Sequence, residues 1–204
     1  SNDQPYDPDK AIMFWDGREE GLEEQAKLPP SSRSEMRGDF KGGAFAIEYI
    51  MPRLAEIEEY VSLFKAAFPD DPEPVTVANY AKAVSVFQRN AVAVSSPFDA
   101  YLDGDKDALT AQQKEGLLLF YGKAGCANCH YGPMLSDWKF HALGVPEHPL
   151  RLEQKGGPDV GNTDFKDFKF RTPSLRNVAL TAPYMHNGML ATLEEVVDFM
   201  DHGM

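Results

Sequence analysis

Apolar residues recur at helical spacing in several stretches of the chain. The clearest stretch covers residues 75–94, where one face of an amphipathic helix would carry Val77, Tyr80, Ala81, Val84, Phe87 and Ala91. The same spacing over 47–66 predicts two helices with a break at Pro52, because proline inside a helix lacks the N–H donor and crowds the preceding turn. A shorter helix is predicted over 19–27, with Leu22 and Ala26 on one face.

Capping signals predict where two further helices begin. Thr110 is followed three residues later by Gln113, which is typical of a capping box, and the helix they start would run to Tyr121. Thr192 precedes two glutamates, a pattern that favours the start of a last helix over 193–200.

The segments between these helices are rich in proline and glycine. They cover 1–45 and 131–173, and 95–110 forms a connector that we take as the boundary between two domains, 1–100 and 101–204. The alternation that marks strands is weak throughout. The pattern therefore predicts an all-α protein with long irregular loops, and such loops usually carry function.

Composition narrows the range of partners. The 43% of hydrophobic residues supports a packed core, and a net charge of −12 disfavours nucleic acid and favours a basic partner. No apolar run reaches the roughly 18 residues of a membrane span, so none is predicted. Two cysteines are too few for a disulfide framework.

Those two cysteines, Cys126 and Cys129, stand three apart with His130 directly after them. A redox pair of this spacing belongs near a βαβ pattern, which is not predicted here. A zinc site could combine both cysteines with His141 and His148, although Gly144 and Pro146 interrupt the helix that would present the two histidines together.

The third chemistry is haem c attachment, which uses C-x-x-C-H. The two thiols form thioether bonds to the vinyl groups of the porphyrin, and the histidine that follows ligates the iron. A predicted helix leads into the motif and methionines lie downstream, so we favour haem c, bound by Cys126, Cys129 and His130.

Several separate motifs then agree on one family. The segments "FYGKAGCANCHYGPMLSDWKFHALGV" (120–145), "FRTPSLRNVALTAPYMHNGMLATLEEVVDF" (170–199), "FWDGREEGLEEQA" (14–26) and "SEM" (34–36) resemble the bacterial di-haem cytochrome c peroxidase and MauG family. The resemblance implies two pseudo-symmetric cytochrome-c-like domains with calcium between them. It assigns 1–100 to the remainder of the peroxidatic domain and 101–204 to the electron-transfer haem domain. The family's other C-x-x-C-H would precede residue 1, so we expect this sequence to be part of a longer protein.

The resemblance also implies the ligands of the electron-transfer haem. Met200 matches the sixth-ligand position, where MauG-type proteins have tyrosine; competing candidates are Met134, Met185, Met189 and Met204. From their chemistry, Arg171 and Arg176 could bind haem propionates, or else form salt bridges. His186 is as readily a structural histidine as a ligand.

Other positions match the family's peroxide and calcium sites. Trp15 matches the tryptophan that passes electrons between the haems, and Gln25 and Glu35 match residues beside the peroxide-binding haem. Backbone carbonyls of Thr181 and Pro183 match calcium ligands. The acidic segment 103–107 lacks the glycine and glutamate of an EF-hand loop and is interpreted as a solvated turn.

The resemblance implies reduction of hydrogen peroxide to water in the periplasm. Electrons would come from a small cytochrome c or copper protein, and the protein could form a homodimer. One alternative is a MauG-type oxidase that acts on a protein or small molecule, and Met200 argues against it. Another is a single-haem electron carrier without enzyme activity.

Overall fold

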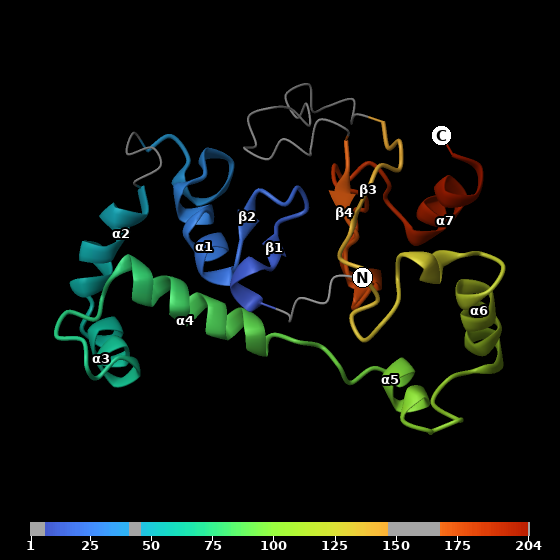
Figure 1. Ribbon diagram of the computed structural model, residues 1–204, viewed down its shortest axis with the longest axis horizontal. Helices are drawn as coiled ribbons and strands as arrows, with labels where there is room; N and C mark the ends of the chain where they lie inside the picture. Colours follow the sequence, from blue (N-terminus) through green and yellow to red (C-terminus); the bar gives the residue numbers. More distant parts are fainter. Residues whose placement is uncertain (1–6, 41–45, 147–167, 204) are drawn as a thin grey trace. The chain divides into compact units, whose positions relative to one another are not determined.

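The computed structural model describes residues 7–40, 46–146 and 168–203 (Figure 1). The chain divides into two compact units, one formed by Ser1–Phe14 with Glu19–Val92 and the other by Trp15–Arg18 with Ala93–Met204. The short segment Trp15–Arg18 thus belongs with the unit that carries the two cysteines. The division of the chain into domains 1–100 and 101–204 stays a prediction.

The first unit is mainly helical. Its elements are β1 (Ile12–Met13), β2 (Glu19–Glu20), α1 (Leu22–Lys27), α2 (Ala46–Ala55), α3 (Glu58–Ala67) and α4 (Val77–Asn90), with helical turns at Pro8–Lys10, Pro29–Ser31 and Arg33–Arg37. Strands β1 and β2 pair antiparallel, with Ile12 opposite Glu20. Helix α1 packs on α4, and α2 contacts both α3 and α4. The buried apolar side chains are Ala26, Ala46, Ile47, Met51, Phe64 and Ala81.

Helix α4 is present as predicted, and Ala81 of its predicted face is buried, with Val77, Tyr80 and Val84 half-buried, but the end of that face is exposed. Thr76 caps it by accepting a hydrogen bond from the Asn79 N–H at 3.1 Å. Ala81 and Ser85 are buried, whereas Phe87 is 73% exposed. The buried face thus includes Ser85, one turn after Ala81, in place of Phe87.

Two local predictions in this unit were wrong. Helix α2 continues through Pro52 and ends at Ala55, because proline removes only one hydrogen bond of the ladder and the Glu56 N–H still reaches the Pro52 carbonyl at 3.1 Å. The break comes at Ile57, whose backbone is extended. The helix predicted over 19–27 begins only at Leu22, because Glu19 and Glu20 pair with β1.

Ser85 offers a test of the packing between α4 and its neighbours. Its side chain is fully buried, and its hydroxyl has no hydrogen-bond partner among the described residues. Since a buried unsatisfied hydroxyl destabilises a protein by about 1 kcal/mol or more, Ser85→Ala should raise the free energy of unfolding by ~1 kcal/mol. The exposed Ser62→Ala on α3 is the control for helix propensity, and equal gains in the two variants in urea titrations would contradict the prediction.

The second unit holds shorter elements joined by long loops. They are α5 (Pro97–Leu102), α6 (Ala111–Tyr121), the turn Cys126–Asn128, β3 (Phe140–His141), β4 (Phe170–Arg171), the turn Val178–Leu180 and α7 (Leu193–His202). Strands β3 and β4 pair antiparallel. The exposed carboxylates of 103–107 lie in the turn region between α5 and α6, as interpreted from the sequence.

Helix starts in this unit follow their capping residues. The predicted capping box is confirmed at Thr110 with Gln113, and the predicted N-cap Thr192 is confirmed and forms a capping box with Glu195. Helix α5 lies in the segment predicted as a connector, and it too begins with a capping box, formed by Ser96 and Asp99, with Pro97 in its first turn. The described strands are two residues long, and the all-α prediction is confirmed.

Candidate functional site

The two cysteines lie on a single helical turn that follows α6. Gly122 ends α6, and a Cβ at this position would come within 2.6 Å of the Leu118 carbonyl oxygen. Gly125 then adopts a left-handed conformation with φ of 68°, which favours glycine. Cys126 and Cys129 follow as half-buried free thiols at the two ends of the turn. The local sequence thus places both sulfur atoms and His130 on one short, sharply bent segment.

His130 is oriented by the main chain. Its Nδ1 lies 3.0 Å from the carbonyl oxygen of Leu135. A carbonyl can only accept, so Nδ1 carries the proton and Nε2 keeps its lone pair for a metal ion. A hydrogen bond of this kind holds the ring of a metal-binding histidine in place and raises its basicity.

Cys129 also faces two polar side chains. The donor atoms of Cys129, Asp137 and His141 all lie within 4.8 Å of one another. Burial raises the pKa of the Cys129 thiol, and the Asp137 carboxylate raises it further. Burial alone would raise the pKa of Asp137, but hydrogen bonds from Thr172, the Lys139 amide and His141 outweigh it and lower that pKa.

This grouping differs from the zinc alternative considered for the sequence. In the part of the chain that the structure describes, Cys126 is not a member of the cluster, and Asp137 takes its place. His148 lies outside the described residues. The two cysteines are therefore not arranged as a joint pair of zinc ligands.

An open apolar hollow of about 260 Å³ lies beside α6, the helix that precedes the motif, and Leu135, whose carbonyl contacts His130, is among its lining residues. It is lined by Phe98, Leu109, Gln113, Gly116, Leu117, Phe120, Tyr121, Leu135 and Leu175. Helix α6 contributes most of this lining, although none of its residues is buried and Leu118 is 75% exposed. Two thiols, an imidazole with a free Nε2 and this apolar surface fit a covalently attached porphyrin.

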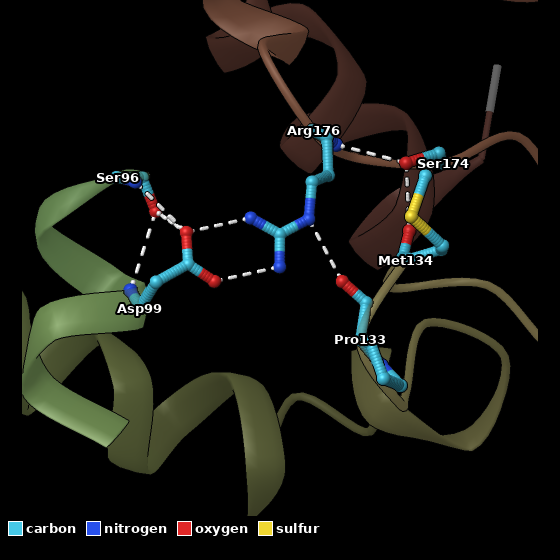
Figure 2. A network of polar contacts seen from close by, with 6 residues as sticks. All are labelled: Ser96, Asp99, Pro133, Met134, Ser174 and Arg176. Atoms are coloured by element: carbon cyan, nitrogen blue, oxygen red, sulfur yellow. Dashed lines mark hydrogen bonds and ion pairs between the residues drawn. The ribbon is translucent and has the colours of Figure 1, made fainter. Parts of the chain in front are cut away.

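Arg176 is held in a polar network (Figure 2). Both terminal nitrogens donate to Asp99, at 2.7 Å each, and Nε donates to the Pro133 carbonyl at 2.7 Å. Asp99 accepts from the N–H and hydroxyl of Ser96 in the cap of α5. The salt-bridge alternative for Arg176 is thus realised, and its role toward a haem propionate stays a prediction.

Arg171 and Trp15 meet in the same unit. The Arg171 N–H donates to the Trp15 carbonyl at 2.8 Å, which ties the segment Trp15–Arg18 to β4. The Arg171 guanidinium lies 5.2 Å from the centre of the Trp138 ring, and burial lowers its pKa. The Trp15 side chain is 54% exposed.

Gln25 and Glu35 belong to the first unit. The Gln25 amide oxygen accepts from Gln88 of α4 at 3.0 Å, so it is fixed between two helices. Glu35 is exposed within the π-type turn Arg33–Arg37, where its backbone angles of φ −115° and ψ −109° are not helical.

The remaining predicted ligands lie near the C-terminal end of the second unit. Met200 is on α7 with its side chain 52% exposed, and Thr181 and Pro183 are exposed in the preceding loop. His186 stacks on Phe170 with ring centres 3.8 Å apart, and burial lowers its pKa. Met204 lies outside the described residues.

The contact between Asp99 and Arg176 should depend on pH. Hydrogen bonds from Arg176 and Ser96 hold the pKa of Asp99 well below its usual range, so the pair stabilises the fold above the unfolded-state pKa of about 3.9. That stabilisation is lost as the pH falls toward the folded pKa. Asp99→Asn should therefore lower Tm by a constant amount above about pH 5, with the difference shrinking below about pH 4.

The control for this prediction is Asp103→Asn, which changes an exposed carboxylate at the end of α5. Its Tm difference should be small at every pH. A difference for Asp99→Asn that persists unchanged at pH 3 would show that the ion pair does not carry the effect.

A search of the described helices found none with the length and hydropathy needed to cross a bilayer.

Comparisons with known proteins agree on one family. A family model described as di-haem cytochrome c peroxidase matches residues 7–107. Cytochrome-c peroxidase IdrP1 of Pseudomonas sp. (strain SCT) is 40% identical over 94% of this chain and 56% of its own length. Cytochrome c551 peroxidase of Pseudomonas aeruginosa is 39% identical over 93% of this chain and 54% of its own length.

A solved structure agrees with these relatives. The crystal structure of a MauG-like protein associated with microbial copper homeostasis superposes with a TM-score of 0.71 and 34% identity, covering 89% of this chain and 56% of that one. The chain therefore spans about half the length of the relatives it matches. A cytochrome-c-like helical fold, the C-x-x-C-H turn with its oriented histidine and these matches together show that the chain belongs to the di-haem cytochrome c peroxidase and MauG family.

Proposed function

We propose that this chain carries the electron-transfer haem c of a di-haem peroxidase. The observation that carries this proposal is the hydrogen bond between His130 Nδ1 and the Leu135 carbonyl, which leaves Nε2 of a C-x-x-C-H histidine for iron. Cys126 and Cys129 would hold the haem through thioether bonds, and Met200 would be the sixth ligand. When bound, haem c supplies an iron couple that takes up and passes on one electron.

The other predicted residues would take part in the reduction of hydrogen peroxide to two molecules of water. This reaction needs two electrons and two protons. Glu35 would move a proton from the proximal to the distal peroxide oxygen, which is general acid–base work, and Gln25 would lie beside the peroxide-binding haem. Trp15 would lie on the electron path. Its attachment to β4 through the Arg171 N–H supports this role, because it ties Trp15 to the unit of the C-x-x-C-H turn.

The proposal includes calcium, the electron donor and the compartment. Thr181 and Pro183 would offer backbone carbonyl oxygens to calcium, a ligand type that this ion prefers. The net charge of −12 favours a donor protein with a basic docking surface, such as a small cytochrome c or copper protein. The periplasm is the compartment that haem c attachment implies.

The test is hydrogen-peroxide-dependent oxidation of a reduced small cytochrome by the protein that carries this chain, produced with haem c attachment. We expect turnover that is lost in His130→Ala, while His141→Ala keeps most of it. Turnover that survives the loss of His130 would contradict the proposal.

A MauG-type oxidase is the second candidate, favoured by the MauG-like solved structure at 34% identity. Residue 200 distinguishes the peroxidase from the MauG-type oxidase, since the resemblance places tyrosine there in MauG-type proteins. Oxidation of a protein or small molecule at the expense of peroxide, without oxidation of a donor cytochrome, would favour the oxidase.

A further inference from the structure

Three consecutive carbonyl groups follow the C-x-x-C-H turn, and each accepts a hydrogen bond from a different side chain. The Pro133 carbonyl accepts from Arg176 Nε at 2.7 Å. The Met134 carbonyl accepts from the Ser174 hydroxyl at 2.7 Å, and the Leu135 carbonyl accepts from His130 at 3.0 Å. Figure 2 shows the first two contacts reaching the loop from the segment around Ser174. The loop that orients His130 is thus itself held from outside.

Leu135 needs that support. Its φ of 52° places it in the left-handed region, which a leucine rarely adopts. Such a conformation persists only where surrounding contacts hold it in place. The Leu135 N–H donates to the Gly132 carbonyl and the Ser136 N–H to the Tyr131 carbonyl, at 3.0 Å each. The contacts of Pro133 and Met134 add side-chain support, so the direction of the Leu135 carbonyl, and with it the hydrogen bond of His130, depends in part on them.

Arg176 is fixed from its other side by α5. Its ion pair with Asp99 is largely shielded from solvent, because the two side chains are only 10% and 18% exposed. Asp99 is anchored in turn by the Ser96 N–H at 2.8 Å and the Ser96 hydroxyl at 2.6 Å. A chain of contacts thus runs from the cap of α5 through Asp99 and Arg176 to Pro133.

We propose that Asp99 and Arg176 are positioning residues for His130. They hold the loop 133–135 so that the Leu135 carbonyl keeps the hydrogen bond from His130, and they thereby set the reduction potential of the iron that His130 would bind. This inference rests on the proposed function, because it needs haem c at Cys126 and Cys129.

The direction of the effect follows from the chemistry of the ligand. A firm hydrogen bond from Nδ1 raises the basicity of the imidazole, and a more basic ligand stabilises the ferric state. Loosening the loop weakens that hydrogen bond. The haem is then easier to reduce, and its reduction potential rises.

Arg176→Lys is the first test, because it keeps the charge but removes the planar fork that reaches Asp99 and Pro133 together. The haem content is measured first, and the reduction potential is then measured by spectroelectrochemical titration. We expect at least a threefold change in the oxidised-to-reduced equilibrium constant in favour of the reduced state. That change is about 28 mV, since tenfold corresponds to 59 mV for one electron.

The chain offers a matched control in its first unit. Arg89 forms an ion pair of the same bidentate kind with Glu23, at 2.7 and 3.0 Å. Arg89→Lys should lower Tm in the same way as Arg176→Lys but leave the potential unchanged. A purely structural role for Arg176 would instead lower Tm in both variants and shift the potential in neither.

Two further variants distinguish the positioning of His130 from a direct electrostatic effect of the two charges on the haem. Asp99→Asn removes a negative charge and Arg176→Gln removes a positive one, so a field effect alone would move the potential in opposite directions. Positioning predicts that both variants raise it. Ser174→Ala loses the contact with the Met134 carbonyl and the hydrogen bond from the Arg176 N–H at 3.2 Å, but it keeps the Arg176 side-chain contacts with Asp99 and Pro133, so it should raise the potential by less.

The outcomes distinguish this inference from the function on which it rests. A parent protein without covalent haem would overturn both. Covalent haem in all variants, with an unchanged potential in Arg176→Lys or opposite shifts in Asp99→Asn and Arg176→Gln, would overturn the positioning role and leave the haem site standing.

Discussion

Replacing Cys126 and Cys129 together by serine is expected to abolish covalent haem attachment. A serine hydroxyl lacks the nucleophilic thiolate that forms a thioether bond with a vinyl group. What remains to hold haem is His130 and an open hollow of about 260 Å³. Intact mass spectrometry of the denatured variant should therefore show the bare polypeptide, whereas the parent chain keeps its haem under the same conditions.

The control for this loss is His141→Ala. It removes the 2.9 Å contact with Asp137 beside Cys129 but keeps both thiols and His130. Its haem should stay covalently bound. Haem that survives denaturation in the double serine variant would show that the attachment lies elsewhere.

Replacing Met200 by leucine is expected to lower the reduction potential by on the order of 0.1 V or more, since axial ligands account for a range of about 0.8 V in haem proteins. Leucine matches methionine in size but has no sulfur, and thioether ligation is what raises the potential of such a haem. The exposed position of Met200 on α7 makes damage to the fold small. The measurement is again a spectroelectrochemical titration of the haem-loaded chain.

Met134→Leu and Met189→Leu are the matched controls, because both positions were competing ligand candidates in the sequence. Neither should move the potential comparably. A large fall in the reduction potential of Met134→Leu, with none in Met200→Leu, would show that Met134 is the sixth ligand.

Helix starts could be predicted because their signals are local. A threonine and a glutamine three residues apart place both capping partners within one turn, as at Thr110 and Gln113. A capping box at Ser96 and Asp99 also starts α5, inside the segment predicted as a connector. There the Asp99 carboxylate serves both the cap and Arg176, and the second contact joins residues 77 positions apart.

The C-x-x-C-H motif could be recognised for the same reason, since its chemistry resides in five adjacent residues. The contacts that hold the His130 ring in place could not be predicted from the sequence. They depend on a leucine at φ of 52° and on Ser174 and Arg176, some 40 residues along the chain from the carbonyls they bind. The spacing of these residues in the sequence does not indicate that they are in contact.

Packing decided the features that were mispredicted. On α4, Phe87 of the predicted face is exposed, whereas Ser85 is buried and Gln88 donates a hydrogen bond to Gln25 of α1. Helix α2 passes through Pro52 because the rest of its hydrogen-bond ladder is intact. Helix propensity alone accounts neither for packing between helices nor for the intact hydrogen bonds around a proline.

Haem content and linkage in the 204-residue chain test the central claim most directly. The measurement is an alkaline pyridine haemochrome spectrum, with intact mass, of the chain produced together with haem c attachment. We predict one haem per chain, with the spectrum of a porphyrin linked by two thioether bonds. Two titratable free thiols and no haem, or zinc bound in its place, would contradict the account.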